Sequence, residues 1–119
     1  MSQVISSYTH TQALEEGMLV PIDPAILKEA GIRFRSVLTK ALCNLLMDGL
    51  DDDGQSFQGR LWDVLMLFRC AAKRANEDFV TFCFEIWRRG TSEARTLYAH
   101  LGPDDHSQPV LTFMLPDDW

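Results

Sequence analysis

The chain has 119 residues, of which 46% are hydrophobic, and this length and composition fit a single globular domain, residues 1–119. Its formal net charge of −6 argues against direct binding of nucleic acid or an anionic membrane, because phosphate groups are bound by clustered lysine and arginine. No apolar run reaches the ~18 residues that span a bilayer, and the first residues lack a signal-peptide pattern, so we expect a cytoplasmic protein.

The first third of the chain predicts two short helices and one short apolar segment. The first helix begins after Thr9, a capping residue, and ends at Gly17. The apolar segment from Met18 to Ile22 contains a proline and is an option for an edge strand. The second helix begins at Asp23, which precedes another proline, and ends at Gly31.

Two longer helices are predicted in the middle of the chain. Apolar residues recur at helical spacing from Ser36 to Asp48, with polar residues on the opposite face. A polar loop that contains two glycines follows this helix. The second helix runs from Arg60 to about Asn76 and is apolar nearly all round, so we expect it to be the most buried helix.

The last third predicts three strands separated by turn signals, namely Phe79 to Trp87, Glu93 to Leu101 and Pro109 to Leu115. Helices followed by a run of strands with short turns favour the α+β class and antiparallel pairing. We therefore expect a three-stranded antiparallel meander packed on two long helices, with a fourth edge strand from Met18 to Ile22 as an option.

The face of this sheet that points away from the helices carries the candidate partner-binding residues. Alternation along the strands places Trp87, Tyr98 and Met114 there, together with His100 and Glu85. Tryptophan and tyrosine are enriched in binding hot spots, and an exposed apolar patch often marks a partner site. The sequence leaves open the alternative that the N-terminal segment folds over this face and buries it.

A catalytic role would use the same face of the sheet. His100, Tyr98 and Glu85 form the alternative site, for an enzyme or a small-ligand binder, with His100 as the general base. The chain has no nucleophile elbow and no phosphate loop. The polar loop fails the calcium pattern, because Gly49 and Arg60 occupy the two chelating ends. The leading hypothesis therefore has no catalytic residue, no metal and no cofactor.

Acidic residues gather in clusters that form a second candidate surface. Asp51, Asp52 and Asp53 lie in the polar loop, and Asp104 and Asp105 lie in the turn before the last strand. If the fold brought the clusters together, they could imitate a phosphate track and occupy a nucleic-acid-binding groove on another protein. The simpler interpretation is that acidic loops keep a small protein soluble.

Three sequence blocks carry a family resemblance. They are residues 5–9 with 13–20, residues 59–65, and residues 102–105 leading to 109–116. Because they occur together and in this order, the chain resembles a family of small uncharacterised bacterial proteins, a domain of unknown function often encoded on plasmids, phages and other mobile elements. The resemblance implies no catalytic residue. It implies a setting in which small acidic proteins often bind a host protein.

The leading functional hypothesis is thus a non-enzymatic, cytoplasmic protein-binding module of a mobile element that acts on a host protein. The small-ligand binder or enzyme is the runner-up. A homodimer that pairs through an exposed sheet edge, or through the outer sheet face, is a third option.

Overall fold

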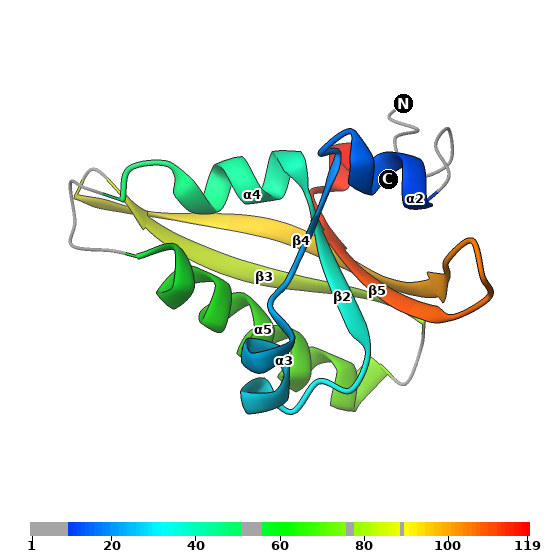
Figure 1. Cartoon of the computed structure of the whole chain (residues 1–119). Helices are drawn as coiled ribbons and strands as arrows, with labels where there is room; N and C mark the ends of the chain where they lie inside the picture. Colours follow the sequence, from blue (N-terminus) through cyan, green and yellow to red (C-terminus); the bar gives the residue numbers. More distant parts are fainter. Residues whose placement is uncertain (1–9, 51–55, 76–77, 89) are drawn as a thin grey trace.

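The computed structural model describes residues 10–50, 56–75, 78–88 and 90–119, and a five-stranded sheet organises them (Figure 1). In chain order the strands are β1 (Leu19–Pro21), β2 (Arg35–Thr39), β3 (Phe79–Arg88), β4 (Thr91–Pro103) and β5 (Pro109–Met114). Their order in the sheet is β1-β2-β5-β4-β3, and only the β2–β5 pair is parallel. The helices are α2 (His10–Glu15), α3 (Pro24–Ala30), α4 (Lys40–Met47), α5 (Phe57–Ala75) and the 3-10 helix η1 (Pro116–Asp118).

The α+β class is confirmed, but the predicted three-stranded antiparallel meander on two long helices is wrong. The described sheet is mixed and has five strands, because β2 pairs with β5 and β1 pairs with β2. The optional edge strand at Met18 to Ile22 corresponds to β1. Its Pro21 lies at the edge of the sheet, a position that tolerates a residue without a backbone N–H.

The predicted helix from Ser36 to Asp48 is in fact strand β2 followed by the shorter helix α4. Every residue of β2 after Arg35 is buried. Because β2 is covered on both faces, its apolar residues Val37 and Leu38 are adjacent, and the strand lacks the alternation that identifies a half-exposed strand. Thr39 ends the strand and begins the helix, because its hydroxyl accepts a hydrogen bond from the backbone N–H of Leu42 at 3.3 Å.

Helix α3 begins and ends at the predicted residues. The carboxylate of Asp23 accepts a hydrogen bond from the backbone N–H of Ala25 at 2.9 Å. At the other end Gly31 has a φ of 78°, in the left-handed region that glycine adopts without strain. The 19-residue α5 is the longest described helix and packs against β3.

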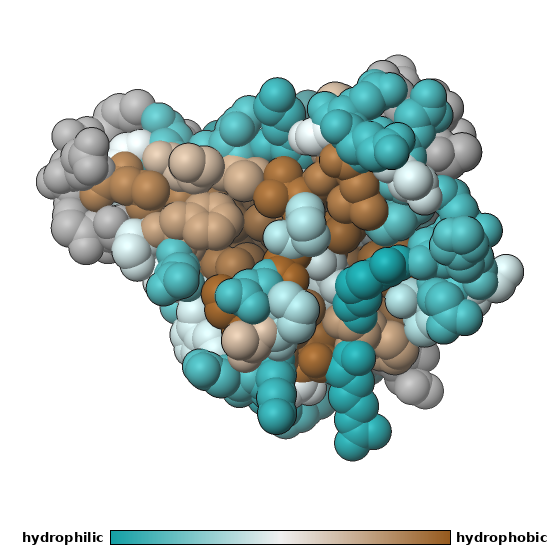
Figure 2. All heavy atoms as spheres, viewed as in Figure 1, coloured by the Kyte–Doolittle hydropathy of each residue, from teal (hydrophilic) through white to brown (hydrophobic). Residues whose placement is uncertain are grey.

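The main core lies between one face of the sheet, here called the inner face, and helices α3, α4 and α5. The strands contribute alternate residues to it, namely Val80, Phe82, Phe84, Ile86, Leu97, Ala99, Leu111 and Phe113, which are all buried. Figure 2 shows apolar atoms reaching the surface in a band between α4 and α5, with hydrophilic side chains on either side of it.

The opposite, outer face is covered over β2 and β5 and open over most of β3. Residues of α2, β1, β2 and β5 form a second, smaller core there, namely Ala13, Leu19, Val37 and Val110. Helix η1 is held nearby, because the hydroxyl of Thr39 donates to the carboxylate of Asp118 at 2.6 Å. By contrast, Thr81, Cys83 and Glu85 of β3 are exposed. The two faces of the sheet therefore differ in what covers them as well as in composition.

Candidate functional site

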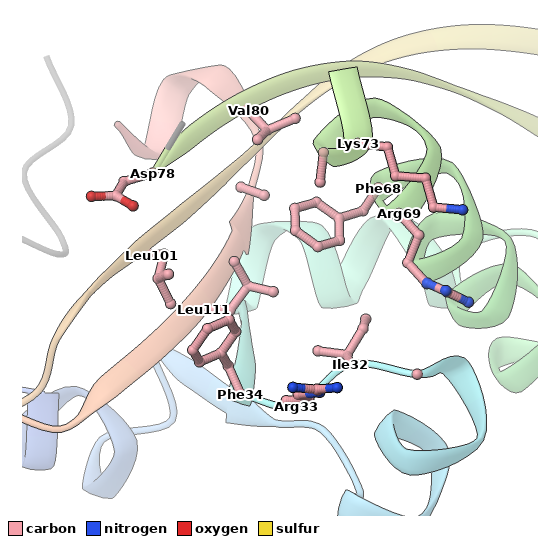
Figure 3. Close-up of a pocket in the computed structure, with 13 residues that line it drawn as sticks. Ile32, Arg33, Phe34, Phe68, Arg69, Lys73, Asp78, Val80, Leu101 and Leu111 are labelled. Atoms are coloured by element: carbon pink, nitrogen blue, oxygen red, sulfur yellow. The ribbon is translucent and has the colours of Figure 1, made fainter. Parts of the chain in front are cut away.

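A groove opens on the inner face of the sheet, beside the C-terminal half of α5. This inner groove is a pocket of about 460 Å³, open on one side, among α5, the connection between α3 and β2, and the three C-terminal strands (Figure 3). Its volume lies within the range of ligand pockets, roughly 300–1,000 Å³. Its apolar lining is formed by Ile32, Phe34, Phe68, Ala72, Val80, Ala99, Leu101 and Leu111.

The wall of the inner groove nearest the core is held by aromatic packing. The ring of Phe68 meets the ring of Phe113 edge to face, with centroids 5.1 Å apart, and the ring of Phe82 at 6.1 Å. At the β4 end of the groove, the backbone N–H of Leu101 donates to the carbonyl of Asp78 at 2.8 Å. Packing between α5 and the sheet therefore forms this wall of the groove.

Three cations, Arg33, Arg69 and Lys73, line the inner groove. Arg69 and Lys73 are four residues apart and so share one face of α5, while Arg33 comes from the connection between α3 and β2 (Figure 3). No ion pair joins any of the three to a residue that the structure describes. Asp78 is the one carboxylate among the described lining residues. In a chain of net charge −6 this is a local concentration of positive charge.

Arg69 is positioned by the end of α3. A Cβ atom at Gly31 would lie 3.2 Å from the guanidinium carbon of Arg69, so the guanidinium lies directly against the glycine backbone. The carbonyl groups at a helix C-terminus carry partial negative charge, which favours a cation at this place. Gly31 therefore ends the helix and also leaves room for the Arg69 side chain.

The structure separates the residues of the predicted partner-binding patch. Met114 is fully buried, because the outer face of β5 is covered. Tyr98 is half-buried and packs on the ring of Phe79, with centroids 5.0 Å apart. Trp87 lies near the turn between β3 and β4 and is 46% exposed. Of the three anchors proposed from sequence, Trp87 is the one with a large exposed surface.

The alternative trio of His100, Tyr98 and Glu85 does not form one site. His100 and Tyr98 share the outer face of β4, and the ring of His100 lies 5.0 Å from that of Trp119. Glu85 pairs with Ala94, which precedes His100 by six residues on β4. At about 3.3 Å per residue, the two strand positions are roughly 20 Å apart. The geometry therefore brings His100 and Tyr98 together and leaves Glu85 apart from them.

Asp105, from the second candidate surface, has a role inside the fold. Its carboxylate accepts hydrogen bonds from the backbone N–H groups of Thr11 at 2.8 Å and His10 at 3.0 Å, at the start of α2. These bonds, the one from Thr11 foremost, lower the pKa of Asp105. The other acidic cluster, residues 51–53, lies outside the described residues.

Asp104 is likewise engaged within the chain. Its carboxylate accepts hydrogen bonds from the backbone N–H groups of Gln108 at 2.9 Å and His106 at 2.8 Å, and from the guanidinium of Arg35. The bond from Gln108 is the largest of the causes that lower the pKa of Asp104 to about 2. Asp104 and Asp105 thus fasten the β4–β5 turn to β2 and α2, and their hydrogen-bonding capacity is used within the fold.

A second, smaller pocket lies on the outer side of the sheet. It has a volume of about 180 Å³ and is lined by His10, His100 and Thr112, among others. Within the described residues, no group of three or more His, Cys, Asp or Glu side chains is arranged to hold a metal ion. The inner groove is larger than this pocket and carries three cations that form no ion pair with a described residue, so it is the stronger candidate of the two.

The cations of the inner groove were not among the site residues predicted from sequence. Arg69 and Lys73 stand near the end of a helix, where cations suit the helix dipole, so their presence has an ordinary explanation. A usable signal is their four-residue spacing, which places both on one face of the helix. Arg33 carries no such signal, because only the tertiary fold brings it beside α5.

Comparison with known proteins identifies no relative of this chain. No protein-family model, curated protein or solved structure matches the chain. The resemblance to a family from mobile elements therefore stays an expectation that rests on three sequence blocks. Among the described helices, none combines the length and the apolar character needed to cross a membrane.

Proposed function

We propose that this protein is a non-enzymatic binding domain that holds an acidic segment of a partner protein, anchored by apolar side chains, in the inner groove. The observation that carries the proposal is an apolar groove whose cations Arg33, Arg69 and Lys73 have no ion pair with a described residue. The family resemblance adds the expectation that the domain is an accessory module of a mobile element, acting in the cytoplasm on a host protein.

Apolar contact supports the proposal as the source of affinity. Phe34 is 41% exposed at the groove, and Leu101 is half-buried on its floor. Burying one large apolar side chain of a partner contributes roughly 1.5–3 kcal/mol before the costs of association. Two or three such anchors therefore contribute roughly 3–9 kcal/mol before those costs.

The cations support an acidic partner as the specific one. An exposed ion pair contributes only about 0.2–1 kcal/mol, so the three cations select a ligand more than they hold it. A segment with carboxylates beside its apolar anchors satisfies both features of the groove. A lysine-rich segment with the same anchors is repelled.

The open shape of the groove favours a segment of a protein over a small molecule. Small-molecule sites bury most of the ligand surface, whereas this groove is open along one side. Three cations in a chain of net charge −6 also fall short of the basic surface that a nucleic acid requires.

Selection of random peptides displayed on phage, against the purified protein, tests the proposal without assuming a partner. Enriched peptides are expected to combine Phe, Leu or Ile with Asp or Glu. The double variant Arg33→Glu/Lys73→Glu is expected not to bind these peptides. Both side chains are exposed, so the substitutions leave the core intact.

The matched control is Lys28→Glu/Lys40→Glu, which makes the same change in net charge at two exposed lysines outside the groove. It is expected to retain the selected peptides. Enrichment of basic or uncharged peptides, or equal loss in both double variants, would contradict the proposal. A Phe34→Ala variant tests the apolar contacts separately and is expected to bind the same peptides more weakly.

A further inference from the structure

Strand β3 forms one edge of the sheet. Within the described residues it pairs with β4 alone, along all ten of its residues (Figure 1). In an edge strand, alternate backbone N–H and C=O groups point away from the neighbouring strand and have no partner in the sheet. Natural edges are commonly protected by proline or lysine, and residues 81–87 contain neither.

A hollow runs beside this edge, between β3 and α5. It is lined on the strand side by Cys83, Phe84 and Glu85, and on the helix side by Asp63, Met66 and Leu67. Leu67 is 38% exposed there. A strand edge next to a helix with apolar side chains is the arrangement in which proteins take up an extended peptide as an additional strand.

The charge along the edge selects the chemistry of that peptide. The carboxylates of Asp63 and Glu85 are both exposed, and Glu85 lies on the outer face of β3. Trp87 follows on the same face and is 46% exposed, so its ring can also attract a cation. A strand laid against β3 would place alternate side chains beside Glu85 and Trp87, and the intervening ones beside Met66 and Leu67 of α5.

We propose that the edge of β3 between residues 81 and 85 takes up an extended segment of a partner protein in which apolar residues alternate with lysine or arginine; the carbonyl of Trp87, farther along the edge, already accepts a hydrogen bond from Arg60. The apolar residues pack on α5, and the basic residues face Glu85 and Trp87. Main-chain hydrogen bonds to β3 supply the rest of the affinity. This site is separate from the inner groove and takes a segment of opposite charge.

A second copy of this chain is a poorer occupant of the edge. Its β3 carries one carboxylate, Glu85, and one basic residue, Arg88 at the strand end, so it lacks the basic residues alternating with apolar ones that suit this edge, and a register that places the two Glu85 side chains opposite each other brings like charges together. Like charges on adjacent strands are destabilising. Charge complementarity therefore favours a basic segment of another protein.

An NMR titration of the isotope-labelled protein tests the proposal. The probe is a synthetic eight-residue peptide of alternating Val and Lys with blocked ends, and the matched probe alternates Val and Glu. The Val/Lys peptide is expected to shift the backbone amides of β3, and the Val/Glu peptide to leave them unchanged. A Val/Lys peptide with N-methyl groups on alternate backbone nitrogens, which removes the donors that face β3, is expected not to bind.

Two charge reversals complete the test. Glu85→Lys is expected to lower the affinity for the Val/Lys peptide about tenfold. Glu29→Lys, at an exposed position on α3 outside the hollow, is expected to leave this affinity unchanged. Equal binding by Glu85→Lys and the unmodified protein would overturn the proposal. Binding that survives N-methylation, shifts confined to the inner groove, or a free protein that is a dimer paired through β3 would overturn it as well.

Discussion

The buried guanidinium of Arg60 donates a hydrogen bond of 2.8 Å to the backbone carbonyl of Trp87, and so joins the first turns of α5 to the far end of β3. The same side chain donates to the carbonyls of Leu46, at 3.1 Å, and Asp48, at the end of α4. Arg60 is only 2% exposed. A buried charge is tolerated when hydrogen bonds replace its water, and here three carbonyls do so. One residue therefore holds two helix ends and a strand end together.

Replacing Arg60 with Met is expected to lower the free energy of unfolding by about 2–4 kcal/mol, because three carbonyls, one buried and two partly buried, lose a charged donor. Urea denaturation measures the change. Arg74→Met, at an exposed position near the end of the same helix, is the control and is expected to change stability by less than about 0.5 kcal/mol. Equal stability of the two variants would mean that the Arg60 hydrogen bonds contribute little to folding.

The hydroxyl of Thr39 accepts a hydrogen bond at the start of α4 and donates one to Asp118. Thr39→Val keeps the shape of the side chain and removes both bonds, and the expected loss is about 1–2 kcal/mol. Thr39→Ser keeps the hydroxyl and is expected to retain most of the stability. Thermal unfolding of the two variants beside the unmodified protein checks this order, and a serine variant as unstable as the valine variant would refute it.

Acid is expected to weaken the fold through the β4–β5 turn. The pKa of Asp104 is lowered on folding from 3.8 to about 2, so the folded state binds this proton less readily than the unfolded state. The resulting stabilisation is complete above about pH 4 and is lost as the pH falls through about 2. Urea unfolding between these values should show a steeper loss for the unmodified protein than for Asp104→Asn. Parallel curves for the two proteins would contradict this account.

Gly31 offers a way to disturb Arg69 without changing charge. Gly31→Ala is expected to cost about 1–2 kcal/mol, because its φ of 78° lies in the left-handed region. The added methyl group also crowds the guanidinium of Arg69, so the variant is expected to bind acidic peptides more weakly at the inner groove. Gly17→Ala is the matched control, because Gly17 has a φ of 74° but no atom within 4 Å of the added Cβ. A similar loss of stability with unchanged peptide binding is expected there, and equal weakening of peptide binding by both variants would refute the role of Arg69.

The parts of the fold that carry local signals could be predicted from sequence. Asp23 and Gly31 marked the ends of α3, and alternation marked β3, β4 and β5 with the correct residues facing the core. Strand β2 could not be found in this way, because burial on both faces removes alternation and leaves a run that also fits a helix. Its parallel pairing with β5 joins segments far apart in the chain, for which no local pattern exists.

In the candidate sites too, features with a local sequence signal could be predicted and features set by the tertiary fold could not. Alternation placed Trp87 and Glu85 correctly on the outer face of β3, which is an edge strand of the described sheet. It could not show that Met114, on the same face, is buried, because burial depends on what the folded chain lays over that face. Nor could it bring Arg33 beside Lys73, since their proximity exists only in the folded chain.

A peptide titration tests whether the inner groove binds an acidic segment. The probe is a fluorescent twelve-residue peptide of Leu, Phe and Glu, beside one in which Lys replaces Glu, with binding followed by fluorescence anisotropy. We predict that the acidic peptide binds to the unmodified protein. The Arg33→Glu/Lys73→Glu variant is expected to bind it about tenfold more weakly, and the Lys28→Glu/Lys40→Glu variant is expected to bind it with unchanged affinity. Equal affinity of the two double variants for the acidic peptide, or tighter binding of the lysine peptide by the unmodified protein, would contradict the claim.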